Sequence, residues 1–283
     1  MRPLEDLCAI ARQAAWGATD ILRAYYRGDT LAIDNSGEGP VTAADLAANQ
    51  QILSHLHQEL GTADFGYLSE ETYQAQGIPG DRDWIWIIDP LDGTKDFIQK
   101  TGEYAIHLAL VYQGRPEVAI VACPEAEILY AAVKGSGTVA YDRAGNSRSP
   151  RVADRDRLAD LTVVVSRSHR DQRFNQLLAA LPCQNQHAVG SVGGKIAAIV
   201  EQKADLYLSL SGKSAPKDWD MAAPELILTE AGGQFTHFDG QPLRYAHGDI
   251  SQWGGRIASN GPNHADLCQI LQAQLGNLDR VAP

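Results

Sequence analysis

WIWIIDPLDGT, residues 84–94, is the stretch that decides the fold of this 283-residue chain. Its first five residues, Trp84–Ile88, are all apolar, which predicts a strand that is covered on both faces. Pro90 carries no backbone N–H, so we expect the hydrogen-bond ladder of this strand to end there. The strand therefore delivers two carboxylates, Asp89 and Asp92, at its carboxyl end.

The two carboxylates stand three positions apart on a segment that Pro90 and Gly93 hold in shape, so they can converge on one point. Like charges at one point are costly unless a cation lies between them. Hard oxygen ligands of this kind suit Mg²⁺. The alternative is a turn in which Asp89 and Asp92 cap the backbone of a following helix.

Further acids stand where a strand ends or a helix begins. Glu70 and Glu71 follow an apolar strand, so a second strand ends in acids. Asp220 stands just before a helix with an apolar face, where an N-cap is the simplest explanation for an Asp taken alone. Asp45 is expected at the third position of a helix capped by Thr42, which favours a carboxylate and leaves a catalytic role open.

The first half of the chain predicts two helices and then a largely antiparallel set of strands. Apolar residues recur at three- and four-residue steps from Leu4 to Tyr25, and a second helix is expected from about Thr42 to Leu60. The expected strands are Phe65–Ser69, Trp84–Ile88, Tyr104–Tyr112, Val118–Cys123 and Ile128–Val133.

The second half alternates strands and helices, which indicates an α/β layer. We place a boundary near residue 155 and expect an N-terminal α+β domain over 1–155 and a C-terminal α/β domain over 156–283. The expected elements are strands Leu161–Ser166, His187–Ser191 and Asp205–Ser209, and helices near Arg170–Leu181, Gly194–Gln202 and Met221–Ala231.

Composition excludes several classes of protein. The chain is 44% hydrophobic and 21% charged, as folded globular proteins are. Its formal charge of -11 argues against a nucleic acid polymer or an anionic membrane as partner. Apolar runs are too short to cross a bilayer and the N-terminus has no leader pattern, so we expect a cytoplasmic protein. Its four scattered cysteines predict reduced, mostly buried thiols.

Three motifs carry a specific resemblance that covers nearly the whole chain. They are DPLDGTKDFI at Asp89–Ile98, Ser69-Glu70-Glu71 upstream, and WDMAAPELILTEAGG at Trp219–Gly233 downstream. In this order and approximate spacing they resemble the inositol monophosphatase superfamily of Mg²⁺-dependent, lithium-sensitive phosphatases. The resemblance implies that family's layered α/β sandwich.

The resemblance also implies roles for individual residues. It assigns two or three Mg²⁺ ions around the substrate phosphate to ligands at Glu70, Asp89, the carbonyl of Leu91, Asp92 and Asp220. It gives Thr94 the task of orienting the nucleophilic water and Asp45 that of holding the threonine hydroxyl, with Glu70 also catalytic. A hydroxyl alone cannot be a base at neutral pH, so a carboxylate partner and a metal are the minimum workable set.

Other positions resemble the CysQ-type 3′(2′),5′-bisphosphate nucleotidases within that superfamily. Lys95 directly follows Gly93-Thr94 and would place a cation near a second phosphate, although a solvated lysine is equally compatible with its residue type. Ser166 and His169 end a strand in groups that can receive an anion. A lone histidine at a strand end is also often just a polar surface group.

A Gly/Ser loop that opens a helix, Gly190–Lys195, can present backbone amides to a phosphate or ribose. Gly190, Ser191 and Lys195 are therefore expected substrate contacts, as are Gly93 and Thr94 of the DPLDGT motif. CysQ-type sequences read GSSLK at this point, whereas two glycines intervene before Lys195 here. Lys213 and Lys217 are either substrate cations or solvated charges.

The sequence thus predicts hydrolysis of adenosine 3′,5′-bisphosphate to AMP and phosphate, with 3′-phosphoadenylyl sulfate as a related substrate. The alternatives are inositol 1-phosphate or a sugar bisphosphate such as fructose 1,6-bisphosphate, cleaved by the same chemistry. A non-catalytic metal or nucleotide sensor is the alternative from another class. The expected partner is a small phosphate ester, and the resemblance leaves a homodimer open because the family includes monomers and dimers.

Overall fold

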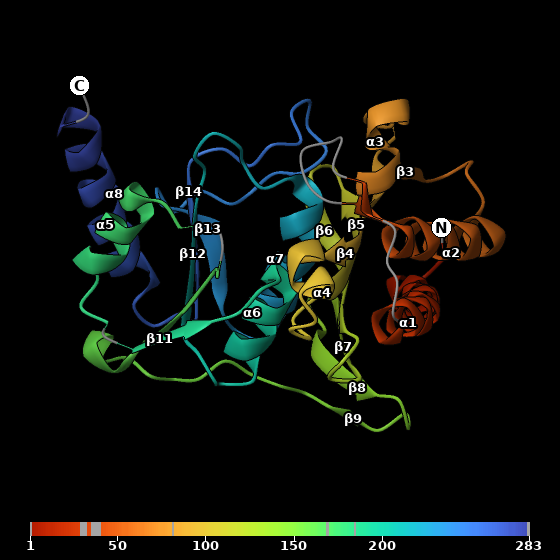
Figure 1. The fold of residues 1–283 in the computed structure, drawn as a ribbon, viewed down its shortest axis with the longest axis horizontal. Coiled ribbons are helices and arrows are strands. Elements are labelled where there is room, and N and C mark those ends of the chain that lie inside the picture. The colour runs from red at the N-terminus through yellow and green to blue at the C-terminus, as the bar shows by residue number, and fades with distance from the viewer. Residues whose placement is uncertain are drawn as a thin grey trace.

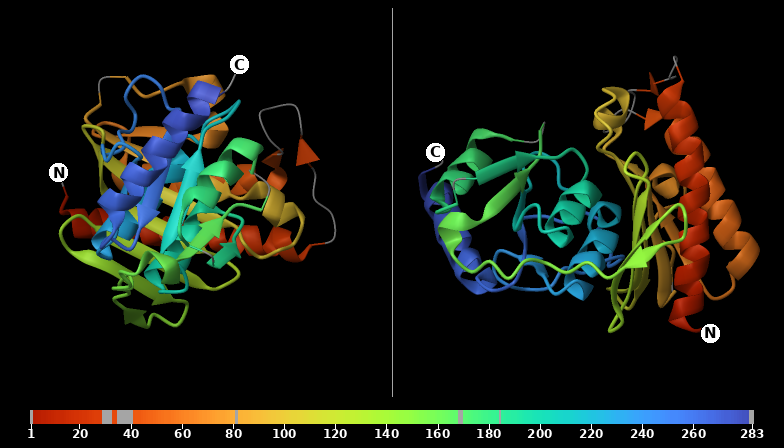
Figure 2. Two further views of the ribbon diagram at one scale, coloured as in Figure 1. Left: turned by 90° about the vertical axis from the view of Figure 1, so that its left-hand side faces the viewer. Right: turned by 90° about the horizontal axis from the view of Figure 1, so that it is seen from below.

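The computed structural model describes residues 2–28, 33–34, 41–80, 82–167, 170–183 and 185–281. Figures 1 and 2 show alternating layers: a helix pair, a large sheet, a second helix pair, a smaller sheet and an outer helix pair. The expected layered α+β architecture is confirmed, with a mostly antiparallel sheet from the first half and an α/β layer from the second.

The larger sheet contains seven strands in the order in which they follow one another along the chain. They are β3 (Gly66–Ser69), β4 (Trp84–Asp92), β5 (Ala105–Tyr112), β6 (Arg115–Cys123), β7 (Ile128–Val133), β8 (Gly137–Asp142) and β9 (Ser147–Arg148). β3 and β4 are parallel, and the later neighbours are antiparallel. The carboxyl ends of β3 and β4 therefore lie side by side, with Ser69 opposite Ile88.

One face of this sheet is covered by α1 (Leu4–Arg27) and α2 (Ala43–Leu60), which follows the short pair β1 (Ile33–Asp34) and β2 (Val41–Thr42). Trp86 and Ile88 of β4 pack into the core beneath α1 and α2. Ile85 and Ile87 point to the opposite face and belong to another core. β4 is thus buried on both faces, as its unbroken apolar sequence predicts.

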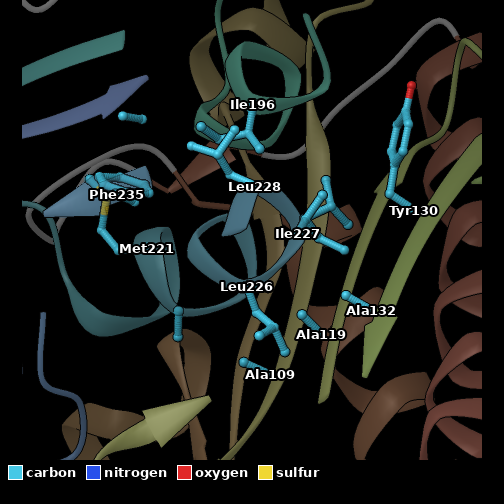
Figure 3. Packing of buried hydrophobic residues seen from close by; sticks show 14 of the residues in the cluster. Ala109, Ala119, Tyr130, Ala132, Ile196, Met221, Leu226, Ile227, Leu228 and Phe235 are labelled. Atoms are coloured by element: carbon cyan, nitrogen blue, oxygen red, sulfur yellow. The ribbon is translucent and has the colours of Figure 1, made fainter. Parts of the chain in front are cut away.

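The opposite face is covered by α6 (Val192–Val200) and α7 (Asp218–Glu230). In Figure 3, Leu226 and Ile227 of α7 lie over Ala109, Ala119 and Ala132 of three adjacent strands. Alanines on this face let the helix axis approach the sheet closely. The packing therefore fixes the start of α7 relative to the end of β4.

The smaller sheet has the strand order β11-β10-β12-β14-β13. Its strands are β10 (Thr162–Val165), β11 (Asn185–Ala188), β12 (Leu206–Leu210), β13 (Gln234–His237) and β14 (Gly255–Ser259). β10 is parallel to β11 and β12, whereas β14 is antiparallel to β12 and β13. The outer face is covered by α5 (Gln172–Ala180) and α8 (His264–Val281).

Several predicted boundaries are wrong. β4 does not end at Pro90 but continues to Asp92, because a bulge accommodates the proline. α7 begins at Asp218, before the predicted start at Met221, and β11 ends at Ala188 because Ser191 caps α6. Elements without a sequence prediction are β1, β2, α3 (Glu70–Gln76), α4 (Thr94–Ile98), η1 (Leu158–Asp160), β8, β9, β13, β14 and α8.

The predicted boundary near residue 155 falls between β9 of the larger sheet and β10 of the smaller one. The division into domains over 1–155 and 156–283 stays a prediction. Within the described ranges, no helix combines the length and apolarity needed to cross a membrane. The four cysteines are free thiols, and three of them are buried, as expected.

Candidate active site

The end of β4 carries the two carboxylates of the DPLD motif. Asp89 pairs with His107 of β5, and Asp92 pairs with Ala105, so three residue steps on β4 oppose two on β5. In a regular strand, residues three apart point to opposite faces. The extra residue of the bulge changes this alternation and lets Asp89 and Asp92 face one point.

A third carboxylate, from the second half of the chain, lies beside Asp89 and Asp92. Asp220 stands at the third position of α7, and its Oδ2 accepts a hydrogen bond of 2.6 Å from the backbone N–H of Lys217. It is therefore not the N-cap that the sequence alone suggested, although it does cap the first turn. One oxygen each of Asp89, Asp92 and Asp220 lies within 4.8 Å of the others.

Backbone amides orient these carboxylates. Oδ1 of Asp89 accepts the N–H of Leu91 at 3.0 Å. Oδ2 of Asp92 accepts the N–H groups of Val192 and, at 3.1 Å, Gly193, which open α6. The positive end of the helix dipole thus faces Asp92. These bonds tie the bulge in β4 to the start of α6.

Glu70 is the first residue of α3 and follows directly after β3. The parallel pairing of β3 with β4 places it beside Asp89. Burial first, and then the charge of Asp220, raises the pKa of Glu70 well above its ordinary value. Burial and the charge of Glu70 do the same for the pKa of Asp89. The structure thus brings together the four carboxylates that sequence reasoning selected.

The donor set fits a hard divalent cation. Burial, followed by the charge of Asp92, raises the pKa of Asp220 to about 7. Four carboxylates held this close repel one another, and cations among them would remove both the repulsion and the rise in pKa. All four donors are oxygens, which Mg²⁺ prefers over softer ligands. This cluster could therefore hold Mg²⁺, and family resemblance adds the carbonyl of Leu91.

Thr94 lies next to this cluster at the start of α4. Its hydroxyl is 3.3 Å from Oδ1 of Asp45 and 3.3 Å from the carbonyl oxygen of Leu91. Oδ2 of Asp45 accepts the backbone N–H of Thr42 at 2.8 Å, which forms the predicted capping box of α2. Asp45 therefore combines the cap with the Thr94 contact, as expected. Gly93 adopts φ 92°, which favours glycine, and lies against Ser191.

The Gly/Ser loop forms the N-terminus of α6. Ser191 is buried, and its hydroxyl caps the helix by accepting the N–H of Gly194 at 3.0 Å. Lys195 is only 1% exposed, and its ammonium group donates to the carbonyl oxygens of Gly190 at 2.6 Å and Ser191 at 3.2 Å. Burial lowers the pKa of Lys195 to about 8. The ammonium group of Lys195 therefore stabilises the Gly/Ser loop by binding its carbonyl oxygens.

The remaining candidate residues lie on α4, after β10 and before α7, and one of them falls outside the described residues. Lys95 is exposed on the first turn of α4, and Ser166 is half-buried just after β10. Lys213 is exposed in the segment between β12 and α7, and Lys217 donates to the hydroxyl of Ser251 at 3.3 Å. His169 lies outside the described residues, so its predicted substrate contact stays a prediction.

Sequence reasoning missed two residues that shape the site. His107 is 1% exposed, and its Nε2 lies 3.3 Å from Oδ2 of Asp92. Glu103 accepts the N–H of Gly190 at 2.8 Å and pairs with Arg167 at 2.7 Å, so it anchors the Gly/Ser loop. The available signal for His107 was a single imidazole inside an otherwise apolar strand, Ala105–Tyr112.

Comparison with known proteins places these features in context. Residues 3–275 match the inositol monophosphatase family. The 3′(2′),5′-bisphosphate nucleotidase CysQ of Salmonella typhimurium is 33% identical over 246 residues, which are 86% of this chain and 93% of that protein.

Solved structures show the same fold. The extragenic suppressor protein suhB of Bartonella henselae superposes with a TM-score of 0.80 at 26% identity, over 94% of this chain and 98% of that one. CysQ of Bacteroides thetaiotaomicron, described as a bacterial member of the inositol monophosphatase family, gives a TM-score of 0.76 at 27% identity. The match covers 90% of this chain and 97% of that one.

Proposed function

The chain belongs to the inositol monophosphatase family of phosphatases, and from that premise we propose that it hydrolyses adenosine 3′,5′-bisphosphate to AMP and phosphate with Mg²⁺. The observation that carries the phosphatase chemistry is the convergence of Asp89, Asp92 and Asp220 beside Glu70. The likeness to bisphosphate nucleotidases supports the choice of substrate. We place 3′-phosphoadenylyl sulfate second, as a related ester.

In the proposed reaction, water attacks the phosphorus in line with the leaving alkoxide. Mg²⁺ ions held by Glu70, Asp89, Asp92, Asp220 and the Leu91 carbonyl would polarise the phosphate and lower the pKa of water. The Thr94 hydroxyl donates to Asp45 and so keeps its lone pairs available to the water. Asp45 is fixed by Thr42 and can take up the proton that the attacking water loses through the Thr94 hydroxyl, while the leaving alkoxide takes a proton from solvent to become the hydroxyl of AMP.

The proposed substrate contacts surround this centre. Gly93 and Ser191 lie against each other, which brings the N-terminus of α6 to the edge of the carboxylate cluster. We propose that Gly190 and Ser191 face the nucleotide while Lys195 holds their carbonyl groups in place. Lys95 is exposed beside the motif and is the proposed partner of the second phosphate. We retain Ser166 and His169 as proposed contacts of the substrate, as the sequence predicts.

A second candidate substrate is inositol 1-phosphate, because the family that matches the chain is described as inositol monophosphatase. The chemistry of the carboxylate cluster is the same for both esters. The two substrates differ in the second phosphate and the base, which only the nucleotide presents to Lys95 and the Gly/Ser loop. The location in the cytoplasm and a homodimer remain proposals.

Steady-state kinetics distinguish the candidates. The purified protein is assayed at one Mg²⁺ concentration with adenosine 3′,5′-bisphosphate, 3′-phosphoadenylyl sulfate, inositol 1-phosphate and fructose 1,6-bisphosphate. We expect the highest kcat/KM for adenosine 3′,5′-bisphosphate. A clear preference for inositol 1-phosphate would replace the nucleotidase proposal, and no release of phosphate from any ester would favour a sensor. The Asp89→Asn variant, prepared identically, controls for contaminating phosphatases.

A further inference from the structure

His107 occupies the space between the elements that build the carboxylate cluster. It lies on β5 directly opposite Asp89, and only 1% of the side chain is exposed. Its Nδ1 is 3.2 Å from the carbonyl oxygen of Trp219, which precedes Asp220. Its Nε2 is 3.3 Å from Oδ2 of Asp92. One ring therefore reaches both the bulge of β4 and the first turn of α7.

The contact with Trp219 defines one function of the ring. A carbonyl oxygen can only accept, so Nδ1 carries the proton and donates it to Trp219. Asp220 follows Trp219 directly, and Asp220 also accepts from the N–H of Lys217. The hydrogen bond from His107 therefore holds the peptide group next to Asp220 at a fixed distance from β5.

The other side of the ring is closed by α6. A Cβ atom at Gly193 would lie 2.4 Å from Nε2 of His107, 2.8 Å from Ala105 Cβ and 2.9 Å from Val121 Cγ1. Real Cβ atoms essentially never come within 3.0 Å of another heavy atom. The N–H of Gly193 meanwhile donates to Oδ2 of Asp92 at 3.1 Å. Glycine at this position thus lets α6 reach Asp92 past an imidazole ring.

This contact gives a physical reason for the glycine at position 193, where the Gly/Ser loop differs from the GSSLK of CysQ-type sequences. A side chain at position 193 would push the start of α6 away from His107, and with it two of the amides that orient Asp92. A smaller residue at 107 would leave a void instead. His107, together with Ala105 and Val121, therefore requires glycine at position 193, and the imidazole ring makes the closest of the three approaches.

We propose that His107 is a positioning residue that sets the separation of Asp92 and Asp220, and that glycine at position 193 makes room for its ring. This inference rests on the proposed function insofar as the carboxylates hold Mg²⁺. His107 donates to the Trp219 carbonyl and packs against Gly193 and, through Nε2, which forms no hydrogen bond within the described part of the chain, against Asp92. It thus joins α7, α6 and β4 at the point where the acids of β4 and α7 converge. It acts through these carboxylates and not on the substrate.

The test measures metal binding directly. Binding of Mg²⁺ and Mn²⁺ to the metal-free variants is followed by calorimetry in the absence of substrate, together with the thermal midpoint Tm. His107→Leu keeps much of the volume but has no donor, and we expect its affinity for Mn²⁺ to fall by about tenfold or more, as for other residues that orient metal ligands. His107→Asn keeps a donor for Trp219, and we expect it to recover most of that loss. His187→Ser, on exposed β11, is the matched control and should bind like the parent.

A second arm tests the requirement for glycine at position 193. Gly193→Ala alone should lower Tm and weaken Mn²⁺ binding, whereas Gly276→Ala, where an added Cβ meets nothing within 4 Å, should do neither. The double variant His107→Ser with Gly193→Ala should regain part of the Tm lost by Gly193→Ala, because the contact with the ring is relieved while those with Ala105 and Val121 remain, and it should not regain affinity. Parent-like Mn²⁺ affinity of His107→Leu, or equal affinities of the Leu and Asn variants, would overturn the proposal.

The two proposals can fail separately. If the parent binds Mn²⁺ but does not cleave adenosine 3′,5′-bisphosphate, the substrate assignment fails and the role of His107 is still decided by the binding data. If the parent binds no divalent cation, the role proposed for His107 fails with the metal site.

Discussion

The hydroxyl oxygen of Thr94 lies 3.3 Å from the carboxylate oxygen Oδ1 of Asp45, although 49 positions separate the two residues in the chain. The other oxygen of Asp45 accepts from the backbone N–H of Thr42 at 2.8 Å and from its hydroxyl at 2.5 Å. One carboxylate therefore caps α2 and also holds the hydroxyl beside the carboxylate cluster. The capping geometry fixes the direction from which Asp45 reaches Thr94.

Comparing substitutions at Asp45 and Thr42 separates the capping of α2 from the contact with the Thr94 hydroxyl. Asp45→Asn removes the charge that accepts the Thr94 hydroxyl, and we expect kcat to fall by roughly 10²- to 10⁴-fold, the range for loss of an acid–base partner. Thr42→Ala removes a cap hydroxyl without touching Thr94, and should cost about 1 kcal/mol of stability with a much smaller loss of kcat. Turnover of Asp45→Asn within threefold of the parent would contradict the assigned role.

Asp89→Asn tests the proposed metal site. The change removes one ligand charge at nearly constant volume, so metal-assisted catalysis worth several kcal/mol should be lost, which corresponds to about 10³-fold or more in kcat/KM. The metal-free variant should be at least as stable as the metal-free parent, because one of the repelling charges has gone. Asp160→Asn at an exposed position is the control for both assays. Near-parent activity of Asp89→Asn would remove Asp89 from the metal site.

The sequence predicted the position of the acids better than their geometry. The apolar run of β4 and the acids after β3 and β4 follow from local pattern, because strand ends bring their next residues to one edge. The bulge that turns Asp89 and Asp92 to one side depends on pairing with β5. Such a pairing is a long-range property, and no local signal in WIWIIDPLDGT reveals it.

The same limit explains the residues that sequence reasoning missed. His107 looks like one polar residue in an apolar strand until α6 and α7 close around it. The strands β13 and β14 are short and separated by a long loop, Phe238–Gly254, so their pairing has no local signature. Asp220 appeared as an N-cap because its place at the third position of α7 depends on Lys217 and Asp218, which precede the apolar pattern.

A buried carboxylate far from the cluster should contribute to stability alone. Asp205 is fully buried and accepts from the N–H of Thr162 at 2.9 Å and from Arg155 at 2.8 Å. Asp205→Ala leaves the half-buried N–H of Thr162 and the Arg155 side chain without their partner, and we expect a loss of roughly 2–4 kcal/mol in the free energy of unfolding. Arg155→Ala removes the partner charge of the buried carboxylate but leaves its bond from Thr162, and should cost less than Asp205→Ala because the Arg155 side chain is 39% exposed and water can replace it.

Urea unfolding of the two variants, with Mn²⁺ binding measured in parallel, checks this expectation. Both should bind Mn²⁺ like the parent below the unfolding transition. A smaller loss of stability in Asp205→Ala than in Arg155→Ala would show that the buried carboxylate is not the anchor of this network.

The stability of the metal-free protein should depend on pH because of the carboxylate cluster. Burial and mutual repulsion raise the pKa of Glu70 and Asp89 well above their ordinary values, and that of Asp220 from 3.8 to about 7. The folded state therefore binds these protons more tightly than the unfolded state does. The resulting stabilisation is complete below about pH 4 and is lost as the pH rises through 7.

Mg²⁺ should reverse this trend, since it binds the deprotonated carboxylates and stabilises the folded state by mass action. We expect Tm in a chelator to fall between about pH 5 and pH 8, and the increase in Tm on adding saturating Mg²⁺ to be larger at pH 8 than at pH 5. Burial raises the pKa of Asp218 to about 7 as well, but it should act equally with and without Mg²⁺, so the difference between the curves isolates the cluster. An equal increase at both pH values would show that these carboxylates do not hold the metal, and Asp89→Asn should show a smaller pH dependence than the parent.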